Sequence, residues 1–259
     1  MLAIVSPAKK LNFGSLAKSP EPSIPIFQDE ANALARIAKT LTRSDLRQMM
    51  KLSDKLADLN YERFQRFSPV PGADEVRPAA FAFAGDTYTG LDAASLSDED
   101  LDFAQGNFRI LSGLYGLLRP LDAIQPYRLE MGRKLANPEG EDLYDFWSHR
   151  ITRELDGQLA GHKSQTIVKL ASNEYFKVID RKMVKAQVLD VDFKEERGGM
   201  LRIIGIFAKR ARGAMARYII QNRIESPKEL KEFAGGGYRF APRLSSELHY
   251  VFTRRTPVR

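Results

Sequence analysis

The sequence contains no cysteine and few histidines, and these two absences exclude several kinds of site. Without cysteine the chain forms no disulfide, no thiolate metal site and no cysteine nucleophile. The three histidines, His149, His162 and His249, lie far apart, and none has a neighbour at the spacing of metal ligands. Zinc and non-haem iron sites usually need more ligands of these kinds. We therefore predict no metal site and no cofactor.

A long hydrophobic run is also absent. The chain has 259 residues, 43% of them hydrophobic, and no stretch approaches the roughly 20 apolar residues of a membrane span. The opening residues MLAIVSPAKK hold a short apolar run with no basic region before it, unlike a signal peptide. No internal repeat or long linker interrupts the sequence. We expect a cytoplasmic monomer with a single domain over residues 1–259 and no membrane partner.

Apolar periodicity predicts strands and helices in irregular alternation. Strands are expected at 2–5, 166–170, 187–193, 200–207 and 248–253, and helices at 28–41, 45–51, 98–111, 142–159 and 208–223. The block GDTYTG at 85–90 is expected to be a glycine-bounded turn. This pattern favours a mixed α/β (α+β) fold, a single compact domain with a mixed β-sheet flanked by helices, over a regular doubly wound sheet.

Basic residues are unevenly distributed along the chain. The net charge is +7, and residues 202–259 hold thirteen Lys or Arg against four Asp or Glu, a local net of +9. One side of the helix expected at 208–223 carries only cations, with Gly213 and Ala216 between them. Solvated helix faces normally mix both signs of charge, so this face predicts a surface that a phosphate backbone approaches. The alternative is a surface helix whose cations pair with acids elsewhere in the fold.

Residues 106–134, GNFRILSGLYGLLRPLDAIQPYRLEMGRK, combine closely spaced glycines with two prolines and five basic residues. Glycine and proline mark turns, and arginines beside turns usually hold phosphate or carboxylate. A helix to residue 111, the hairpin Gly113-Leu-Tyr-Gly116 and a second helical stretch would form a helix-hairpin-helix, whose backbone N–H groups bind a DNA phosphate. The alternative is a tight corner in the core with Leu114 and Tyr115 packed inside.

The first functional hypothesis is therefore binding of double-stranded or distorted DNA through its backbone or its shape. The basic helix would neutralise phosphates, and the glycine hairpin would grip one strand. The candidate DNA-binding residues are Arg109, Gly113, Gly116, Arg119, Arg133, Lys134, Lys209, Arg210, Arg212 and Arg217.

A second hypothesis is an enzyme that acts on a nucleotide or a damaged nucleobase. Several polar side chains lie in glycine- or proline-bounded blocks after expected strands, where α/β proteins tend to place their sites. A carboxylate base beside a lysine or arginine suits hydrolysis or glycosyl transfer. The chain has no P-loop, no dinucleotide fingerprint and no Ser-His-Asp order, so nothing defines the reaction. The pocket candidates are Lys9, Asp86, Tyr88, Arg128, Glu130, Glu174 and Tyr175.

A third hypothesis, direct iron sequestration, needs clustered carboxylates or histidines. The sequence offers only Asp98, Glu99 and Asp100, directly after Ser97. Acidic residues in a first helical turn interact favourably with the helix dipole and often follow a serine cap. We interpret this cluster as the start of a helix.

Several blocks of the chain resemble the bacterial YaaA family of peroxide-stress resistance proteins. They are SPAKK, GDTYTG, LSGLYGLLRPLDAIQPYRLEMG, LASNEYFK and AKRARGAMARYII, in the expected order from residue 6 to residue 220. Lys10 stands where the family usually has threonine. The resemblance implies a cytosolic protein that protects DNA and protein during hydrogen peroxide stress and is linked to lower free iron. It also implies a compact mixed α/β fold with a positively charged cleft and a helix-hairpin-helix-like element that binds double-stranded DNA.

Overall fold

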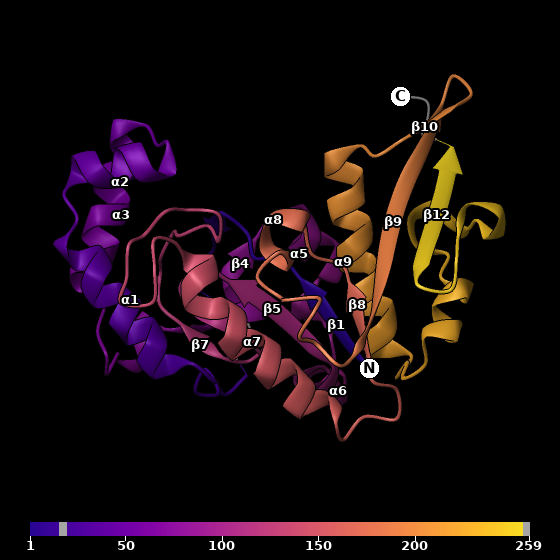
Figure 1. Ribbon diagram of the computed structural model, residues 1–259, viewed down its shortest axis with the longest axis horizontal. Coiled ribbons are helices and arrows are strands. Elements are labelled where there is room, and N and C mark those ends of the chain that lie inside the picture. Colours follow the sequence, from indigo (N-terminus) through magenta and orange to yellow (C-terminus); the bar gives the residue numbers. More distant parts are fainter. Residues whose placement is uncertain (16–19, 256–259) are drawn as a thin grey trace.

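A mixed sheet forms the centre of the protein (Figure 1). The structure is a computed structural model that describes residues 1–15 and 20–255. The eight strands of the sheet in the described residues are β1 (Leu2–Val5), β5 (Phe108–Ser112), β6 (Gly116–Leu118), β8 (Thr166–Lys169), β9 (Gln187–Arg197), β10 (Met200–Arg202), β11 (Arg239–Phe240) and β12 (His249–Arg255). Their order is β11-β12-β9-β8-β1-β5-β6, and β10 pairs with β9. The strands from β12 to β5 run parallel, whereas β11, β10 and β6 are antiparallel to their neighbours.

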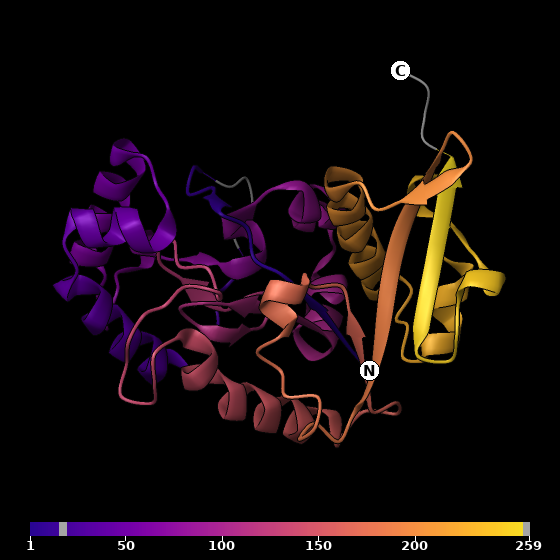
Figure 2. The same ribbon diagram turned by 45° about the horizontal axis from the view of Figure 1, so that its top comes forward.

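Helices flank this sheet and form one end of the molecule. They are α1 (Gln28–Thr40), α2 (Arg43–Met50), α3 (Asp54–Arg66), α4 (Ala79–Ala82), α5 (Asp86–Leu91), α6 (Asp98–Asn107), α7 (Leu143–Leu159), α8 (Asn173–Phe176) and α9 (Gly205–Gln221). Short 3-10 turns lie at Ala73–Glu75, Ala93–Ser95, Pro227–Glu232, Gly235–Gly237 and Pro242–Leu244. Two small antiparallel pairs join β2 (Lys10–Leu11) to β4 (Phe83–Ala84) and β3 (Arg77–Pro78) to β7 (Ala123–Ile124). The views in Figures 1 and 2 agree that α1, α2 and α3 form one end of the molecule, with β9 and β12 at the other.

The parallel strands are covered by helices, as parallel sheets usually are. Every residue of β1 and of β5 is buried. Helices α6 and α9 contact β1, while α8 contacts β5 and α7 contacts β6. One hydrophobic cluster runs from Met1 to Phe252. The mixed sheet with flanking helices confirms the predicted fold class. Within the described part of the chain, no helix combines the length and the apolar character needed to cross a bilayer.

The direction in which the chain crosses the sheet changes beside β1. After β1 the chain next enters the large sheet as β5 on one side, whereas after β8 it enters as β9 on the opposite side. The carboxyl ends of β1 and β8 therefore form a topological switch point. Open α/β sheets bind their ligands in the crevice outside such a point.

The predicted helix-hairpin-helix at 98–118 is wrong. Helix α6 ends at Asn107, and the chain continues as the β-hairpin of β5 and β6, with Ser112 paired to Gly116. Gly116 has a φ of 67° at the turn, a conformation that glycine adopts without strain. Leu114 and Tyr115 are buried, which confirms the alternative of a corner packed in the core. The apolar run forms a strand because pairing with β1 satisfies its backbone groups inside the sheet.

The acidic cluster at 98–100 begins α6, which confirms its interpretation as a helix start. The Ser97 hydroxyl accepts a hydrogen bond from the Asp100 backbone N–H at 3.2 Å, and the Asp100 carboxylate accepts one from the Ser97 backbone N–H. Asp100 also pairs with Arg223 at 2.6 Å. The block at 85–90 is not only a turn, because α5 begins at Asp86.

Candidate functional site

A cavity of about 420 Å³ lies outside the carboxyl ends of β1 and β8, at the switch point. We call it the switch crevice. Its walls are residues 6–10 after β1, residues 84–88 at the start of α5, Leu170, Ser172, Glu174 and Tyr175 after β8, and Lys209 and Arg212 of α9. Four elements that are distant in sequence therefore meet at the place where the topology predicts a ligand.

Five of the seven pocket candidates line this one cavity, namely Lys9, Asp86, Tyr88, Glu174 and Tyr175. The Tyr88 hydroxyl donates to the Ser6 carbonyl at 3.1 Å, which ties α5 to the loop after β1. Burial raises the pKa of both tyrosines, so each stays protonated at neutral pH. The geometric condition of the enzyme hypothesis, that the candidate side chains share one pocket, is met by these five residues.

The other two candidates form a cationic cluster beside the crevice. Glu130 is 2% exposed, and its carboxylate lies 3.1 Å from Arg128, 3.5 Å from Arg133 and 3.5 Å from Lys9. Burial raises the pKa of Glu130, but the three surrounding charges and the Arg128 hydrogen bond outweigh it and hold the pKa below its ordinary value. One carboxylate thus faces three cations, and Lys9 belongs to both the cluster and the crevice.

The expected helix at 208–223 exists, but α9 begins at Gly205, inside the strand expected at 200–207, of which only Met200–Arg202 is extended. Sequence reasoning also misjudged which side of α9 is free. Gly213 and Ala216 are buried, so the small residues do not open a path for a phosphate backbone. Arg217 donates to the carbonyls of Leu91 and Asp92 at 3.0 and 2.8 Å, at the end of α5. Together with the Arg223–Asp100 pair, these contacts confirm part of the alternative, in which basic residues pair within the fold. Lys209 and Arg210 are exposed, and Arg212 is half-buried against the crevice.

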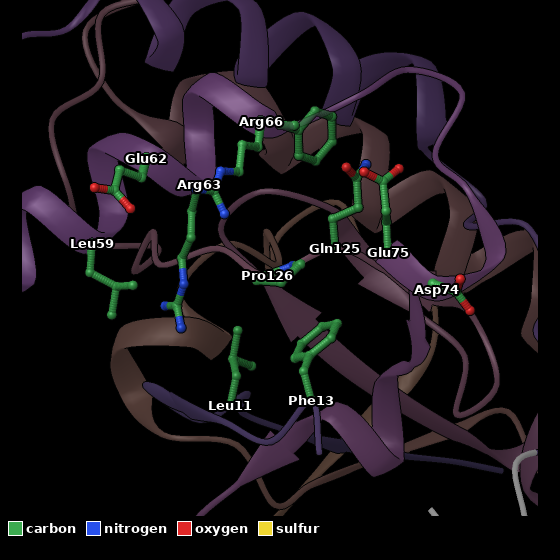
Figure 3. Close-up of a pocket in the computed structure, with 11 residues that line it drawn as sticks. Leu11, Phe13, Leu59, Glu62, Arg63, Arg66, Asp74, Glu75, Gln125 and Pro126 are labelled. Carbon is green, nitrogen blue, oxygen red and sulfur yellow. The ribbon is translucent and has the colours of Figure 1, made fainter. Parts of the chain in front are cut away.

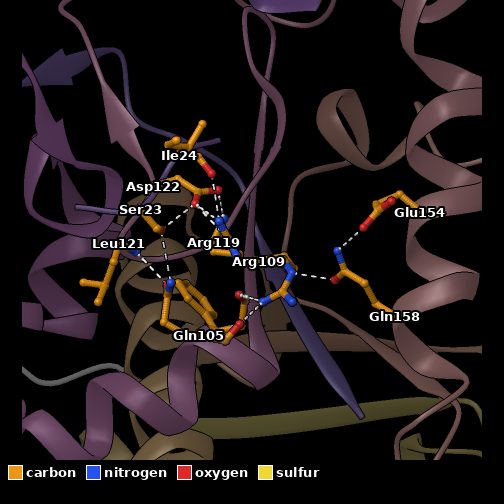
Figure 4. Close-up of polar contacts among 10 residues, drawn as sticks. Ser23, Ile24, Gln105, Arg109, Arg119, Leu121, Asp122, Glu154 and Gln158 are labelled. Carbon is orange, nitrogen blue, oxygen red and sulfur yellow. Dashed lines mark hydrogen bonds and ion pairs between the residues drawn. The ribbon is translucent and has the colours of Figure 1, made fainter. Parts of the chain in front are cut away.

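Three of the predicted DNA-binding residues lie inside the protein, which corrects their assignment. Gly113 and Gly116 are buried in the hairpin, and Arg109 is 4% exposed. Arg109 donates to the Gln158 side chain at 2.7 Å and also to two backbone carbonyls (Figure 4). Burial lowers the pKa of Arg109 to about 10. Arg109 was predicted to contact DNA because the sequence does not show that it lies in a strand, β5, with neighbouring strands on both sides.

Arg119, also predicted to contact DNA, forms contacts within the protein in the part of the fold that Figure 4 shows. Its guanidinium lies 2.9 Å from the Asp122 carboxylate, which has no exposed area, and it donates to the Ile24 carbonyl at 2.8 Å (Figure 4). Its donors are thus engaged in joining the segment after β6 to residues 23–24. Lys134 is exposed and follows Arg133 of the cationic cluster.

A second cavity of about 470 Å³ lies near α3, and sequence reasoning missed it (Figure 3). Leu11 and Phe13 form part of one wall, and the Arg63 guanidinium of α3 points into the space between them and α3. Burial and the nearby Arg128 lower the pKa of Arg63. The only signal available was a lone arginine in a helix, which is too common to single out. None of the seven pocket candidates lines this cavity.

No cluster of three His, Asp or Glu side chains that could hold a metal ion occurs in residues 1–15 and 20–255. The crevice offers Asp86 and Glu174 as carboxylates, and Glu174 also accepts from the Gly132 backbone N–H at 3.3 Å. The arrangement is instead suited to anions, because six cations surround three carboxylates. The cations are Lys9, Lys10, Arg128, Arg133, Lys209 and Arg212, and the carboxylates are those of Asp86, Glu130 and Glu174.

Comparison with known proteins identifies relatives over nearly the whole chain. The profile of a family described as "Peroxide stress protein YaaA" matches residues 1–244. A UPF0246 protein of Ruegeria pomeroyi is 50% identical over 254 residues, which cover 98% of each chain. A UPF0246 protein of Maricaulis maris is 51% identical over 258 residues, covering 99% of this chain and 97% of the relative. A UPF0246 protein of Caulobacter vibrioides is 49% identical over 261 residues, which cover 99% of this chain and 100% of the relative.

Proposed function

The chain belongs to the YaaA family of peroxide stress proteins, and we propose that it protects against peroxide by binding the backbone of double-stranded or distorted DNA at the mouth of the switch crevice. The observation that carries this proposal is the excess of cations over carboxylates around the crevice and the cationic cluster. Phosphate neutralisation by lysine and arginine supplies most of the sequence-independent affinity of proteins for DNA.

Five exposed cations are placed to contact phosphates. The Lys9 side chain is 62% exposed although it lies 3.5 Å from Glu130, so it can turn to an approaching anion. Lys10 and Lys209 line the crevice, and Arg210 follows Lys209 on α9. Lys134 completes the set beside the cationic cluster. Because the carboxylate of Glu130 is buried while these cations are exposed, DNA would meet mainly positive charge.

The link to iron follows from the same electrostatics. DNA condenses cations on its phosphates, and a protein that neutralises those phosphates releases the condensed cations. Ferrous ions among those condensed cations would react with peroxide beside the DNA, and the radicals formed there would break the DNA strand. Bound protein would therefore lower the amount of iron on DNA without a metal site of its own, in keeping with the scarcity of clustered ligands in the described residues.

Fluorescence anisotropy over a range of salt concentrations tests DNA binding. With five phosphates neutralised, log K for a duplex should fall with log[salt] at a slope of about −4 to −5. The double variant Lys209→Glu/Arg210→Glu should weaken binding at least about tenfold and make the slope shallower by about 2. Straight, bent and single-stranded DNA, compared at one salt concentration, show which form is preferred.

The matched control is Lys182→Glu/Lys185→Glu, which changes the net charge equally. Both lysines are exposed, and neither lines the switch crevice nor belongs to the cationic cluster. The control variant should keep the wild-type slope of log K against log[salt], and its DNA affinity should stay within about threefold of the wild type. A flat salt dependence in the wild type, or equal losses in both double variants, would show that the crevice mouth is not a DNA-binding surface.

A further inference from the structure

We propose that the switch crevice is also a binding site for a nucleoside monophosphate, with the phosphate held by Arg212 and hydroxyl or amino groups of the ligand donating to Asp86. The site lies at the carboxyl ends of β1 and β8, where open α/β sheets place small ligands. Its volume of about 420 Å³ is within the range of small-molecule pockets. A DNA duplex can contact only the mouth of such a space, so this inference does not depend on DNA binding.

Arg212 is the first observation that indicates a ligand. Its Nε atom is buried and donates to no acceptor among the described residues. The guanidinium forms no ion pair within the described part of the chain either, although it lines the crevice. A buried donor without an acceptor is costly and uncommon in folded proteins. A phosphate supplies the acceptors and the charge that arginine binds best.

Lys209 extends the same wall of the crevice. It precedes Arg212 by three residues in α9, so both side chains project from one side of the helix. Lys9 and Lys10 approach from the loop after β1. A monophosphate with nearly two negative charges is matched by this group of cations, whereas an uncharged nucleoside is not.

Asp86 requires a hydrogen-bond donor on the ligand, because a carboxylate accepts hydrogen bonds. It is the first residue of α5, is half-buried and lines the crevice. Among the described residues it has no hydrogen-bond or ion-pair partner, and in particular it does not pair with Arg212. The ligand should therefore carry donor groups in addition to its phosphate. A ribose or a nucleobase amino group meets this requirement, and inorganic phosphate does not.

Besides these two polar groups, the crevice is lined by apolar residues and by hydroxyl groups. Pro7, Ala8 and Leu170 contribute apolar surface, together with Tyr88 and Tyr175. The hydroxyls of Ser6 and Ser172 lie 3.2 Å apart on the loops after β1 and β8. A partly apolar body that links a phosphate to hydrogen-bond donors describes a nucleoside monophosphate.

Isothermal titration with AMP, GMP, CMP and UMP tests the proposal, with adenosine and inorganic phosphate as reference ligands. At least one nucleotide should bind saturably at one site per chain, at least tenfold more tightly than adenosine or phosphate. Arg212→Gln and Asp86→Asn should each weaken that binding at least tenfold. Since neither side chain loses a hydrogen bond or an ion pair within the described residues, and Arg212 interacts with Asp192 only through its charge, both variants should melt near the wild-type temperature, which circular dichroism checks.

Two further variants locate the site and separate it from DNA binding. Arg210→Gln, which changes an exposed residue outside the crevice, should bind the nucleotide like the wild type while its DNA affinity falls. Arg63→Gln, in the second cavity, should not change nucleotide affinity. Absence of saturable binding by all four nucleotides, equal affinity for phosphate alone, or loss in Arg63→Gln instead of Arg212→Gln would overturn the proposal. Nucleotide binding without DNA binding would leave this inference standing and remove the proposed function.

Discussion

Gly90 of α5 and Gly213 of α9 bring their two helices into backbone contact. A β-carbon on Gly213 would lie 1.8 Å from the Thr87 carbonyl oxygen, and one on Gly90 would lie 2.1 Å from the Arg210 carbonyl oxygen. Both distances are far below any real contact with a β-carbon, so no larger residue fits at either position without moving a helix. This contact sets the distance between the two walls of the switch crevice that α5 and α9 provide.

We predict that Gly213→Ala lowers the free energy of unfolding by about 3 kcal/mol or more, because the added methyl group meets backbone and not a flexible side chain. Gly157→Ala in α7 is the matched control, since a β-carbon there has no neighbour within 4 Å. The control should stabilise the protein by about 0.5–1 kcal/mol through the helix preference of alanine. Equilibrium urea unfolding measures both changes, and equal effects would contradict the close packing of α5 on α9.

A second prediction concerns the buried carboxylate of the cationic cluster. Glu130→Gln should cost about 2–3 kcal/mol at neutral pH, because it leaves Arg128, Arg133 and Lys9 facing one another without a negative charge. Glu139→Gln, at an exposed pair with Arg150, should cost less than about 1 kcal/mol. Urea unfolding at pH 7 compares the two variants.

The same carboxylate should also make stability depend on pH. Because the folded-state pKa of Glu130 lies below its ordinary value, the unfolded chain binds more protons as the pH falls. The contribution of Glu130 is therefore complete above about pH 4.3, the ordinary glutamate value, and is lost as the pH falls through the folded-state pKa. Wild-type stability should decline in this acidic window more steeply than that of Glu130→Gln. Parallel curves for the two proteins would show that Glu130 does not carry this dependence.

A third prediction distinguishes the β-hairpin from a DNA-binding hairpin. Gly116→Ala should destabilise the protein by roughly 2 kcal/mol or more, since Gly116 has a positive φ and its β-carbon would lie 2.7 Å from the Trp147 ring. The DNA affinity of the folded variant should stay within about twofold of the wild type, because Gly116 is buried. Gly106→Ala in α6, where a β-carbon has open space, should be tolerated. A selective loss of DNA binding in Gly116→Ala would restore a direct role for the hairpin.

Local sequence signals were sufficient to predict those features that neighbouring residues determine, such as helix caps and glycine turns. Ser97 and Asp142 cap the helices that were expected at their positions. Gly198 and Gly199 adopt positive φ values at the turn between β9 and β10, a conformation that glycine takes without strain. The secondary structure of residues 85–90 and 108–118 was predicted wrongly, because a short apolar or glycine-bounded segment can form either a helix or a strand. The decision there depends on partners that are distant in the sequence.

The candidate site was foreseen in part. Lys9, Asp86 and Glu174 were chosen because polar residues after strands gather at one edge of a sheet, and the structure places them in one cavity. Arg212 was assigned to the open side of its helix, since a helical projection does not show which side α5 covers. Arg63 was missed, because only the folded chain brings α3 to Leu11 and Phe13.

By itself the sequence determined the alternation of strands and helices, the capped helix starts, the excess of positive charge and the family, since these depend on residue types and their local spacing. Tertiary structure alone decided which arginines became internal links, as Arg109 did, and which, like Arg212, were left facing a cavity without an acceptor. The physical reason is that burial and the partners of a charge are set by packing between distant segments, and composition does not encode them residue by residue.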